Sequence, residues 1–211
     1  MTVKFETIMN GPFQENCFLI WNDDTKKGIF IDPGDEPEKL MRSASFLNIE
    51  IEGIYNTHAH IDHAGAVAAI KKKLGVPFAL HPEDRPLLDR MPQQAQMFGL
   101  PPMEVPTVDT ELSHGDKLAI LDTEITVLHT PGHSPGGVCF LFDDFVFVGD
   151  TLFSGSIGRT DLPGGSYEQI LDSIRTHLLV LDDNLKVLTG HGPATTIAME
   201  RKFNPFLNGQ M

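Results

Sequence analysis

Residues 57–65 read Thr-His-Ala-His-Ile-Asp-His-Ala-Gly, and this stretch decides how the rest of the chain is interpreted. It follows the β-branched run 51–55, which predicts a strand, and it leads into AGAVAAIKKKLG at 64–75, which predicts a helix ending at a glycine. Within six residues it offers three imidazoles and one carboxylate, separated by small or apolar side chains. Histidines grouped this closely are poor core material and have no reason to cluster on a plain surface. The set therefore predicts a metal site.

The spacing within this stretch favours two ions over one. In an extended loop, His58 and His60 point to the same side and can hold one ion together. Asp62 and His63, where the chain turns into the predicted helix, can face a second ion. Imidazole and carboxylate ligands suit zinc, with iron or manganese as alternatives. We therefore expect two divalent metal ions per chain, with zinc as the first choice.

Three single residues further along the chain extend the set. His133 lies in HTPGHSPGG after a predicted strand, Asp150 ends the apolar run FVFVGD, and His191 lies in LTGHGP, again after a strand. Each alone would be a weak candidate, because a single loop histidine is usually only exposed. Their shared position, at a strand exit beside glycine, makes each a predicted ligand. By contrast, we expect the remaining histidines to be packed or exposed without a role at the metals (His81, His114, His129 and His177).

The pattern of the whole chain predicts two strand-rich halves with helices between and after the strands. The first third alternates apolar strand-like runs with amphipathic helical runs, and the half from Lys117 onward has four strand-like runs followed by a helix and a last strand. Residues 82–116 interrupt this rhythm with many prolines and methionines, and predict one or two helices in a long excursion. Such an excursion is either a lid or wall of a cleft, or a surface insertion. We expect an α+β protein, a four-layer α/β/β/α sandwich forming a single domain over residues 1–211.

Composition and charge narrow the possible partners. The net charge of −13 argues against nucleic acid and against an anionic membrane surface, both of which require a Lys/Arg excess. There is no secretory signal and no apolar run near the length of about 20 residues that spans a bilayer. The cysteines Cys17 and Cys139 lie in apolar runs and predict small buried residues rather than a disulfide. A cytoplasmic protein acting on a small molecule is expected.

Together these motifs resemble the metallo-β-lactamase superfamily over nearly the whole chain. The run THAHIDH is similar to the family's H-x-H-x-D-H motif, and the three later ligand positions follow in the same order. Within the superfamily, GDTLFSGSIGRTDLPGG resembles the glyoxalase II (hydroxyacylglutathione hydrolase) branch, particularly its short bacterial members. Persulfide dioxygenases share much of this segment.

The resemblance implies a specific assignment of ligands. One metal would take His58, His60 and His133, and the other would take Asp62, His63 and His191. Asp150 would bridge the two ions, as would a hydroxide. Asp62 and Asp150 would therefore act in catalysis as well as in metal binding. Asp150 also stands where secreted zinc β-lactamases commonly have cysteine.

Two further residues are candidates outside the ligand set. Asp32, at the strand exit in IDPGD, is expected to orient a ligating histidine, with a turn-stabilising role as the alternative. Arg159, in GSIGR, is the candidate anchor for a glutathione carboxylate, with an ion pair to Asp161 as the alternative. Longer glyoxalase II enzymes bind glutathione with a C-terminal helical domain, whereas 20 residues follow His191 here.

The expected reaction is hydrolysis of an S-2-hydroxyacylglutathione thioester, such as S-D-lactoylglutathione, to a hydroxy acid and glutathione. A metal-bridging hydroxide would attack the carbonyl, and a metal would stabilise the oxyanion. Two alternatives remain open. One is a glutathione persulfide dioxygenase with a single iron held by His58, His133 and Asp150, and the other is an ester or lactone hydrolase of the same fold.

Overall fold

The computed structural model describes residues 3–209, which form two compact units. The first unit runs to Leu112 and includes Ala119–Thr123, and the second comprises Ser113–Leu118 and the chain from Glu124 onward. The expectation of one domain over residues 1–211 stays a prediction, and its ends, 1–2 and 210–211, lie outside the described residues.

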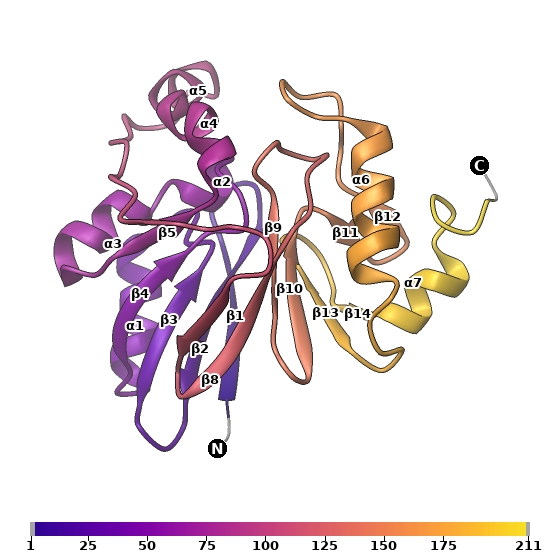
Figure 1. Ribbon diagram of the computed structural model, residues 1–211. Coiled ribbons are helices and arrows are strands. Elements are labelled where there is room, and N and C mark those ends of the chain that lie inside the picture. Colours follow the sequence, from indigo (N-terminus) through magenta and orange to yellow (C-terminus); the bar gives the residue numbers. More distant parts are fainter. Residues whose placement is uncertain (1–2, 210–211) are drawn as a thin grey trace. The chain divides into compact units, whose positions relative to one another are not determined.

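A six-stranded sheet organises the first unit in the part of the chain described, with the order β1-β2-β3-β4-β5-β6 (Figure 1). Its strands β1 to β3 are antiparallel, whereas β3 to β6 run parallel. The strands are β1 Val3–Asn10, β2 Glu15–Asn22, β3 Lys27–Ile31, β4 Glu50–Tyr55, β5 Phe78–Leu80 and β6 Thr110–Glu111. β2 is buried along its whole length, as its apolar run ENCFLIW requires.

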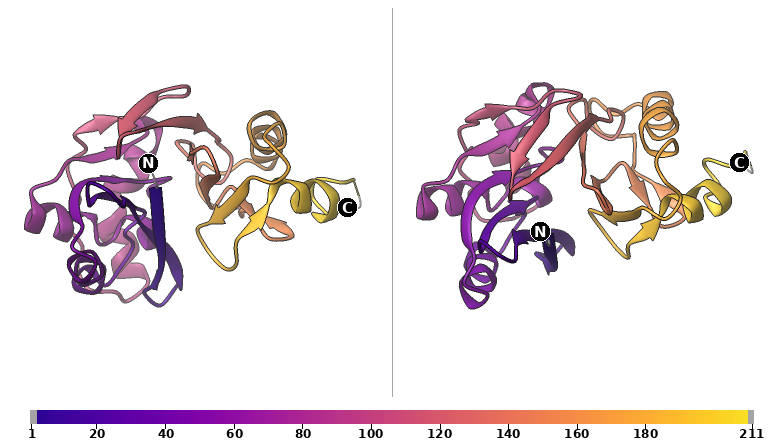
Figure 2. Two further views of the ribbon diagram at one scale, coloured as in Figure 1. Left: turned by 90° about the horizontal axis from the view of Figure 1, so that it is seen from below. Right: turned by 60° about the horizontal axis from the view of Figure 1, so that its bottom comes forward.

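Helices α1 (Pro37–Phe46) and α3 (Val67–Leu74) pack on each other and on β4 (Figures 1 and 2). Their buried residues, among them Leu40 and Ile70, join Phe30 and Ile54 of the sheet in one apolar core. The excursion after β5 contains short helices, as expected. They are η1 Pro82–Asp84, α4 Arg85–Asp89 and α5 Met91–Met97.

The second sheet has the order β14-β13-β10-β9-β8-β7 among the described residues. β10 is parallel to β13 and antiparallel to β9. Its strands are β7 Lys117–Ile120, β8 Thr123–His129, β9 Val138–Leu141, β10 Phe145–Gly149, β13 Lys186–Thr189 and β14 Thr195–Thr196. A small hairpin, β11 (Leu152–Phe153) and β12 (Ser156–Ile157), follows β10.

Three helical segments cover this second sheet (Figure 1). They are α6 Tyr167–Ser173, its π-helical continuation η2 Ile174–Leu178, and α7 Ile197–Phe203. Ile170, Ile174 and Ile197 pack with Val146 and Val187 in the core of the second unit. The sequence pattern did not show the β11–β12 hairpin or helix α7.

The helix predicted over 64–75 corresponds to α3, and a separate helical turn, α2 (Ile61–Ala64), precedes it. A contact with a distant part of the chain separates the two helices. The backbone N–H of Ala66 donates to the carbonyl of Pro33 at 3.1 Å rather than to the preceding helical turn. The first helix is therefore a single turn that carries Asp62 and His63.

No helix within residues 3–209 is long and apolar enough to cross a membrane.

Candidate metal centre

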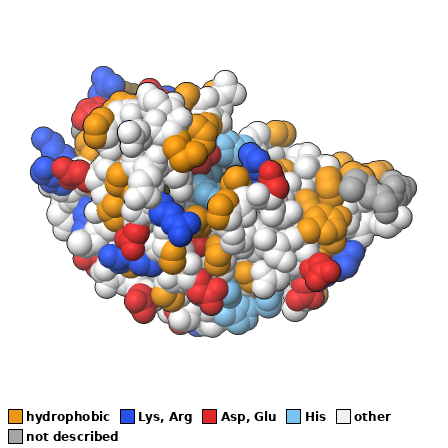
Figure 3. Space-filling model, turned by 90° about the horizontal axis from the view of Figure 1, so that it is seen from above, with side chains coloured by type: hydrophobic (Ala, Val, Ile, Leu, Met, Phe, Trp, Pro, Cys, Tyr) orange, Lys and Arg blue, Asp and Glu red, His pale blue; other side chains and the backbone are white. Residues whose placement is uncertain are grey.

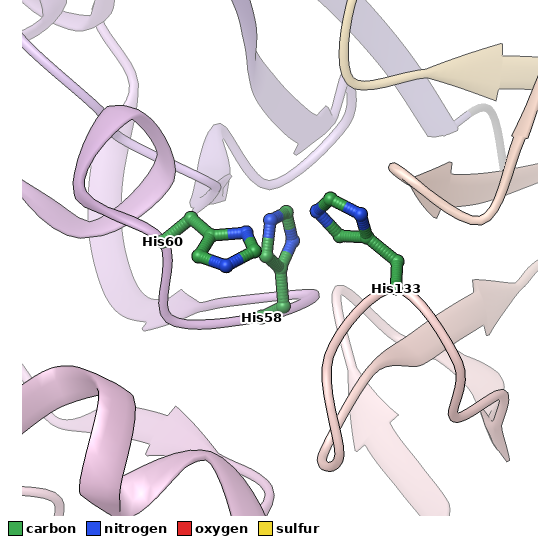
Figure 4. Close-up of side chains that lie close together, drawn as sticks. All are labelled: His58, His60 and His133. Atoms are coloured by element: carbon green, nitrogen blue, oxygen red, sulfur yellow. The ribbon is translucent and has the colours of Figure 1, made fainter. Parts of the chain in front are cut away.

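The first group of candidate ligands lies on the loop and single helical turn that follow β4. Because β3 and β4 are parallel, Asp32 after β3 and residues 56–63 after β4 emerge at the same edge of the sheet. His58 and His60 come from this loop, with ring centroids 4.8 Å apart (Figure 4). The ring of His63, on α2, has its centroid 4.0 Å from that of His58. Local chain geometry alone therefore gathers three imidazoles.

Asp32 is the buried carboxylate that fixes this group. Its Oδ1 accepts the backbone N–H of Thr57 at 2.6 Å, and its Oδ2 accepts the Thr57 hydroxyl at 2.5 Å. The same Oδ2 lies 3.1 Å from Nδ1 of His63. Since a carboxylate oxygen accepts, Nδ1 of His63 carries the proton and Nε2 presents a lone pair. This contact is the one that the expected orienting role requires.

Thr57 fixes the protonated nitrogen of His58 in a similar way. Its hydroxyl proton is directed at Asp32, so Thr57 Oγ1 accepts from Nδ1 of His58 at 3.0 Å. Nε2 of His58 is then the nitrogen with a lone pair. Asp32, His58 and His63 each offer a ligand atom within 4.8 Å of the others. The hydrogen bonds thus set both imidazoles in the tautomer that binds a cation through Nε2.

Tight backbone contacts hold the turn that carries Asp62. A Cβ on Gly34 would lie 1.6 Å from the carbonyl oxygen of Asp62, so only glycine allows the Pro33-Gly34 turn to lie directly against α2. Asp62 Oδ2 is 4.0 Å from Nε2 of His63, and its side chain is 20% exposed. The Asp62 carboxylate therefore stands beside the lone pair of His63 and remains accessible.

In the second unit, His133 stands on the Pro/Gly-rich turn between β8 and β9 (Figure 4). Nδ1 of His133 donates to the backbone carbonyl of Arg159 at 2.8 Å, which leaves Nε2 as the ligand atom. The turn itself is held by Gly132, at φ 134°, where a Cβ would meet the backbone of Ile170 at 2.2 Å. His129 closes the turn through Nε2, 2.9 Å from the Pro135 carbonyl.

Asp150 and His191 meet at the exits of two parallel strands, β10 and β13. The backbone N–H of Gly190 donates to Gly149 at 2.8 Å, which keeps the two exits side by side. Oδ2 of Asp150 lies 3.7 Å from Nε2 of His191 and 3.6 Å from Nε2 of His133. One carboxylate oxygen of Asp150 thus lies between the two imidazole nitrogens.

A family model described as metallo-beta-lactamase superfamily matches residues 10–191. This chain belongs to the metallo-beta-lactamase superfamily. The match covers every residue predicted as a ligand. The expected metallo-β-lactamase fold is thereby confirmed, and the protein is a metal-dependent hydrolase of that superfamily.

Named relatives extend the superfamily assignment. The chain is 41% identical to hydroxyacylglutathione hydrolase GloC of Haemophilus influenzae, and the match covers 99% of this chain and 100% of the relative. A crystal structure of TTHA1623 in a di-iron-bound form has a TM-score of 0.87 at 41% identity, over 96% of this chain and 100% of that one. The BLEG-1 B3 metallo-beta-lactamase has a TM-score of 0.91 at 38% identity, over 98% and 100%.

The superfamily fold, together with the His/Asp groups, implies a dinuclear divalent metal site. The donors of both units fit that group chemically. Imidazoles whose Nδ1 atoms are engaged present Nε2, and carboxylates stand beside them, which is the mixed ligand set of zinc, iron or manganese.

Sequence reasoning missed Glu15, the first residue of the buried strand β2. Its side chain is 1% exposed, with Oε2 accepting from Nδ2 of Asn10 at 2.7 Å and Oε1 lying 3.8 Å from Nδ1 of His63. Burial raises the pKa of the Glu15 carboxyl well above its usual range, and the imidazole of His63 opposes that shift. A charged residue opening the wholly buried run ENCFLIW was the available signal.

Arg159 occupies two roles in the structure. Its backbone carbonyl holds His133, a contact that no sequence pattern predicts. Its exposed guanidinium makes a bidentate ion pair with Asp161, at 2.8 and 2.7 Å. Arg159 holds the pKa of the Asp161 carboxyl down at about 2. The ion pair, given above as the alternative to substrate binding, is therefore present.

Proposed function

We propose that the chain is a hydroxyacylglutathione hydrolase of the glyoxalase II type. The observation that carries the proposal is the end-to-end match, at 41% identity, to a relative that bears this name. The substrate class is a 2-hydroxyacyl thioester of glutathione, with S-D-lactoylglutathione as the reference compound. The products are the hydroxy acid and glutathione.

The proposed ligand sets follow the family resemblance. His58, His60 and His133 would hold one ion, Asp62, His63 and His191 the other, and Asp150 both. When bound, two divalent cations lower the pKa of a water toward neutrality and polarise the thioester carbonyl. Zinc is the proposed metal, and iron and manganese suit the same donors.

The protein's own groups keep these ligands in place. Asp32 holds the Nδ1 proton of His63 and, through Thr57, that of His58, and the Arg159 carbonyl does the same for His133. Preorganised imidazoles need no reorientation when the carbonyl gains negative charge. The glutathione thiolate leaves without a protein acid, because a thiol is far more acidic than an alcohol.

A second candidate is β-lactam hydrolysis, favoured by the likeness to the BLEG-1 B3 metallo-beta-lactamase. Both reactions add water to an activated carbonyl, so the same donors serve either. The substrate, rather than the metals, distinguishes the two functions.

The test is a substrate panel on one zinc-loaded preparation: S-D-lactoylglutathione, a chromogenic cephalosporin, and a simple lactone. The proposal expects kcat/KM for the thioester to exceed that for the other two by at least about 100-fold, a margin of about 2.7 kcal/mol. Preference for the cephalosporin or the lactone would overturn it. Oxygen uptake with glutathione persulfide by an iron-loaded sample, without thioester hydrolysis, would favour a dioxygenase instead.

A further inference from the structure

A small pocket in the first unit lies directly beside a proposed metal ligand. Asp62 lines it together with Phe13, Ile61, Leu100 and Met103. These residues come from the β1–β2 turn, the turn of helix α2, and the segment that follows α5. The pocket is therefore lined both by the excursion over 82–116 and by the segment that carries the candidate ligands of this unit.

The surface that lines the pocket is mostly apolar, and its polar neighbours Asn10 and Asp35 are engaged in hydrogen bonds with other groups. The Asn10 side chain donates to the carbonyl of Ile8 and to Glu15, and its oxygen accepts the backbone N–H of Asp35 at 2.7 Å. The Asp35 carboxylate accepts the backbone N–H of Glu36 at 2.6 Å. A buried water needs two to four polar partners, so the pocket suits a hydrocarbon group better than water.

Its size restricts the occupant to a small group. The space open to the centre of a water-sized group is ≈ 10 Å³, about the minimum for one water and similar to what a methyl group needs. Met103 lines the pocket, and its Cε lies 3.2 Å from where a Cβ on Gly65 would stand. Phe13, which also lines the pocket, meets Phe98 edge to face with ring centroids 5.6 Å apart.

The face that carries α5 shows hydrophobic side chains at its surface (Figure 3). Phe98 and Met97 at the end of α5 are 59% and 83% exposed. Exposed apolar side chains next to Phe13 favour contact with an uncharged group over contact with a charged peptide.

We propose that this pocket receives the acyl side chain of the thioester and limits it to a methyl group or one of similar size. The inference rests on the proposed function and adds the specificity-determining residues, Met103 and Phe13. The methyl of a lactoyl group fills the pocket, a glycoloyl group leaves it empty, and the phenyl ring of a mandeloyl group exceeds it.

The test compares glycoloyl-, lactoyl- and mandeloylglutathione as substrates. Filling a hydrophobic pocket with one carbon changes kcat/KM by about 10-fold or more, so lactoyl should exceed both others by that factor. Met103→Ala should raise the mandeloyl-to-lactoyl ratio of kcat/KM at least about 10-fold. Phe13→Ala, at a 39% exposed turn residue, should shift the ratio the same way with less risk to folding.

Phe46→Ala is the matched control, because Phe46 is 87% exposed at the end of α1. It should leave the ratio unchanged. If the wild type hydrolyses all three thioesters equally, or neither variant moves the ratio while both keep metal and fold, the pocket assignment is wrong and the proposed function stands. If the wild type hydrolyses none of them, the proposed function fails and the pocket loses its substrate.

Discussion

The two units assemble their candidate ligands in different ways. The first draws His58, His60, Asp62 and His63 from one stretch of six residues after a single strand. The second draws one residue from each of three separate segments, and Asp150 meets His133 and His191 only because the sheet aligns the ends of its strands. In each unit, candidate ligands follow the carboxyl ends of two neighbouring parallel strands, β3 and β4 in the first and β10 and β13 in the second. A local motif thus has the same architectural basis as a dispersed one.

The largest effects are expected when one candidate ligand is replaced in each unit, in two separate variants. We expect His58→Ala and His133→Ala each to lower kcat/KM by more than about 100-fold, beyond the range usual for outer-shell partners. The physical reason is that each substitution removes a candidate metal ligand, the Nε2 lone pair, whose orientation a hydrogen bond at Nδ1 already fixes. Metal analysis and circular dichroism should show metal loss with the secondary structure retained. Turnover at wild-type metal content in either variant would break the equivalence of the two units.

Asp32→Asn should have the next largest effect. It weakens the acceptor for His63 and Thr57 while keeping the shape, and outer-shell losses of this kind lower metal affinity by about 10–100-fold. Chelator competition measures it. Glu200→Gln is the matched control, since this buried carboxylate accepts from Gly155, Asn204 and Thr195 within the second unit and touches no candidate ligand. An equal fall in metal affinity in both variants would show a general loss of stability instead.

Part of the candidate site could be predicted from the sequence, and part could not. The H-x-H-x-D-H stretch was visible because its ligands are neighbours in the chain, and Asp150 and His191 were visible as polar residues at apolar strand exits. The role of the Arg159 carbonyl could not be predicted, since a hydrogen bond from the His133 side chain to a backbone carbonyl 26 residues later leaves no sequence pattern. Glu15 and the break between α2 and α3 likewise depend on tertiary contacts, with His63 and with Pro33.

Glu15→Gln should have a smaller effect on metal affinity than Asp32→Asn, up to about 10-fold. Its Oε1 lies 3.8 Å from Nδ1 of His63, against 3.1 Å for Asp32, so Glu15 does not make the direct hydrogen bond to His63 that Asp32 makes. The same chelator assay orders the two variants. A larger loss for Glu15→Gln would mean that Glu15, and not Asp32, is the principal support of His63.

Arg159→Ala should have the smallest effect on the metals, because the backbone carbonyl that holds His133 remains. Without the guanidinium, the pKa of Asp161 should rise from about 2 toward its ordinary 3.8. The depressed pKa of Asp161 stabilises the folded state at pH values above 3.8, and this stabilisation is lost as the pH falls toward 2. The part of this pH dependence that Arg159 causes should be absent in the variant. An NMR titration of Asp161 tests it.

The same variant separates the two roles of the side chain. If Arg159 also binds a glutathione carboxylate, KM should rise several-fold for glutathione thioesters and less for a small neutral thioester. An equal change for both substrates would mean that the guanidinium serves only the ion pair with Asp161.

The most direct test of the central claim is a metal titration of the apo-protein with S-D-lactoylglutathione turnover measured at each step. If the chain holds the implied dinuclear site, thioester hydrolysis should rise with added zinc and reach its plateau at about two ions per chain. His133→Ala should prevent that plateau. A plateau at one ion per chain, or full turnover by the His133→Ala variant, would contradict the account.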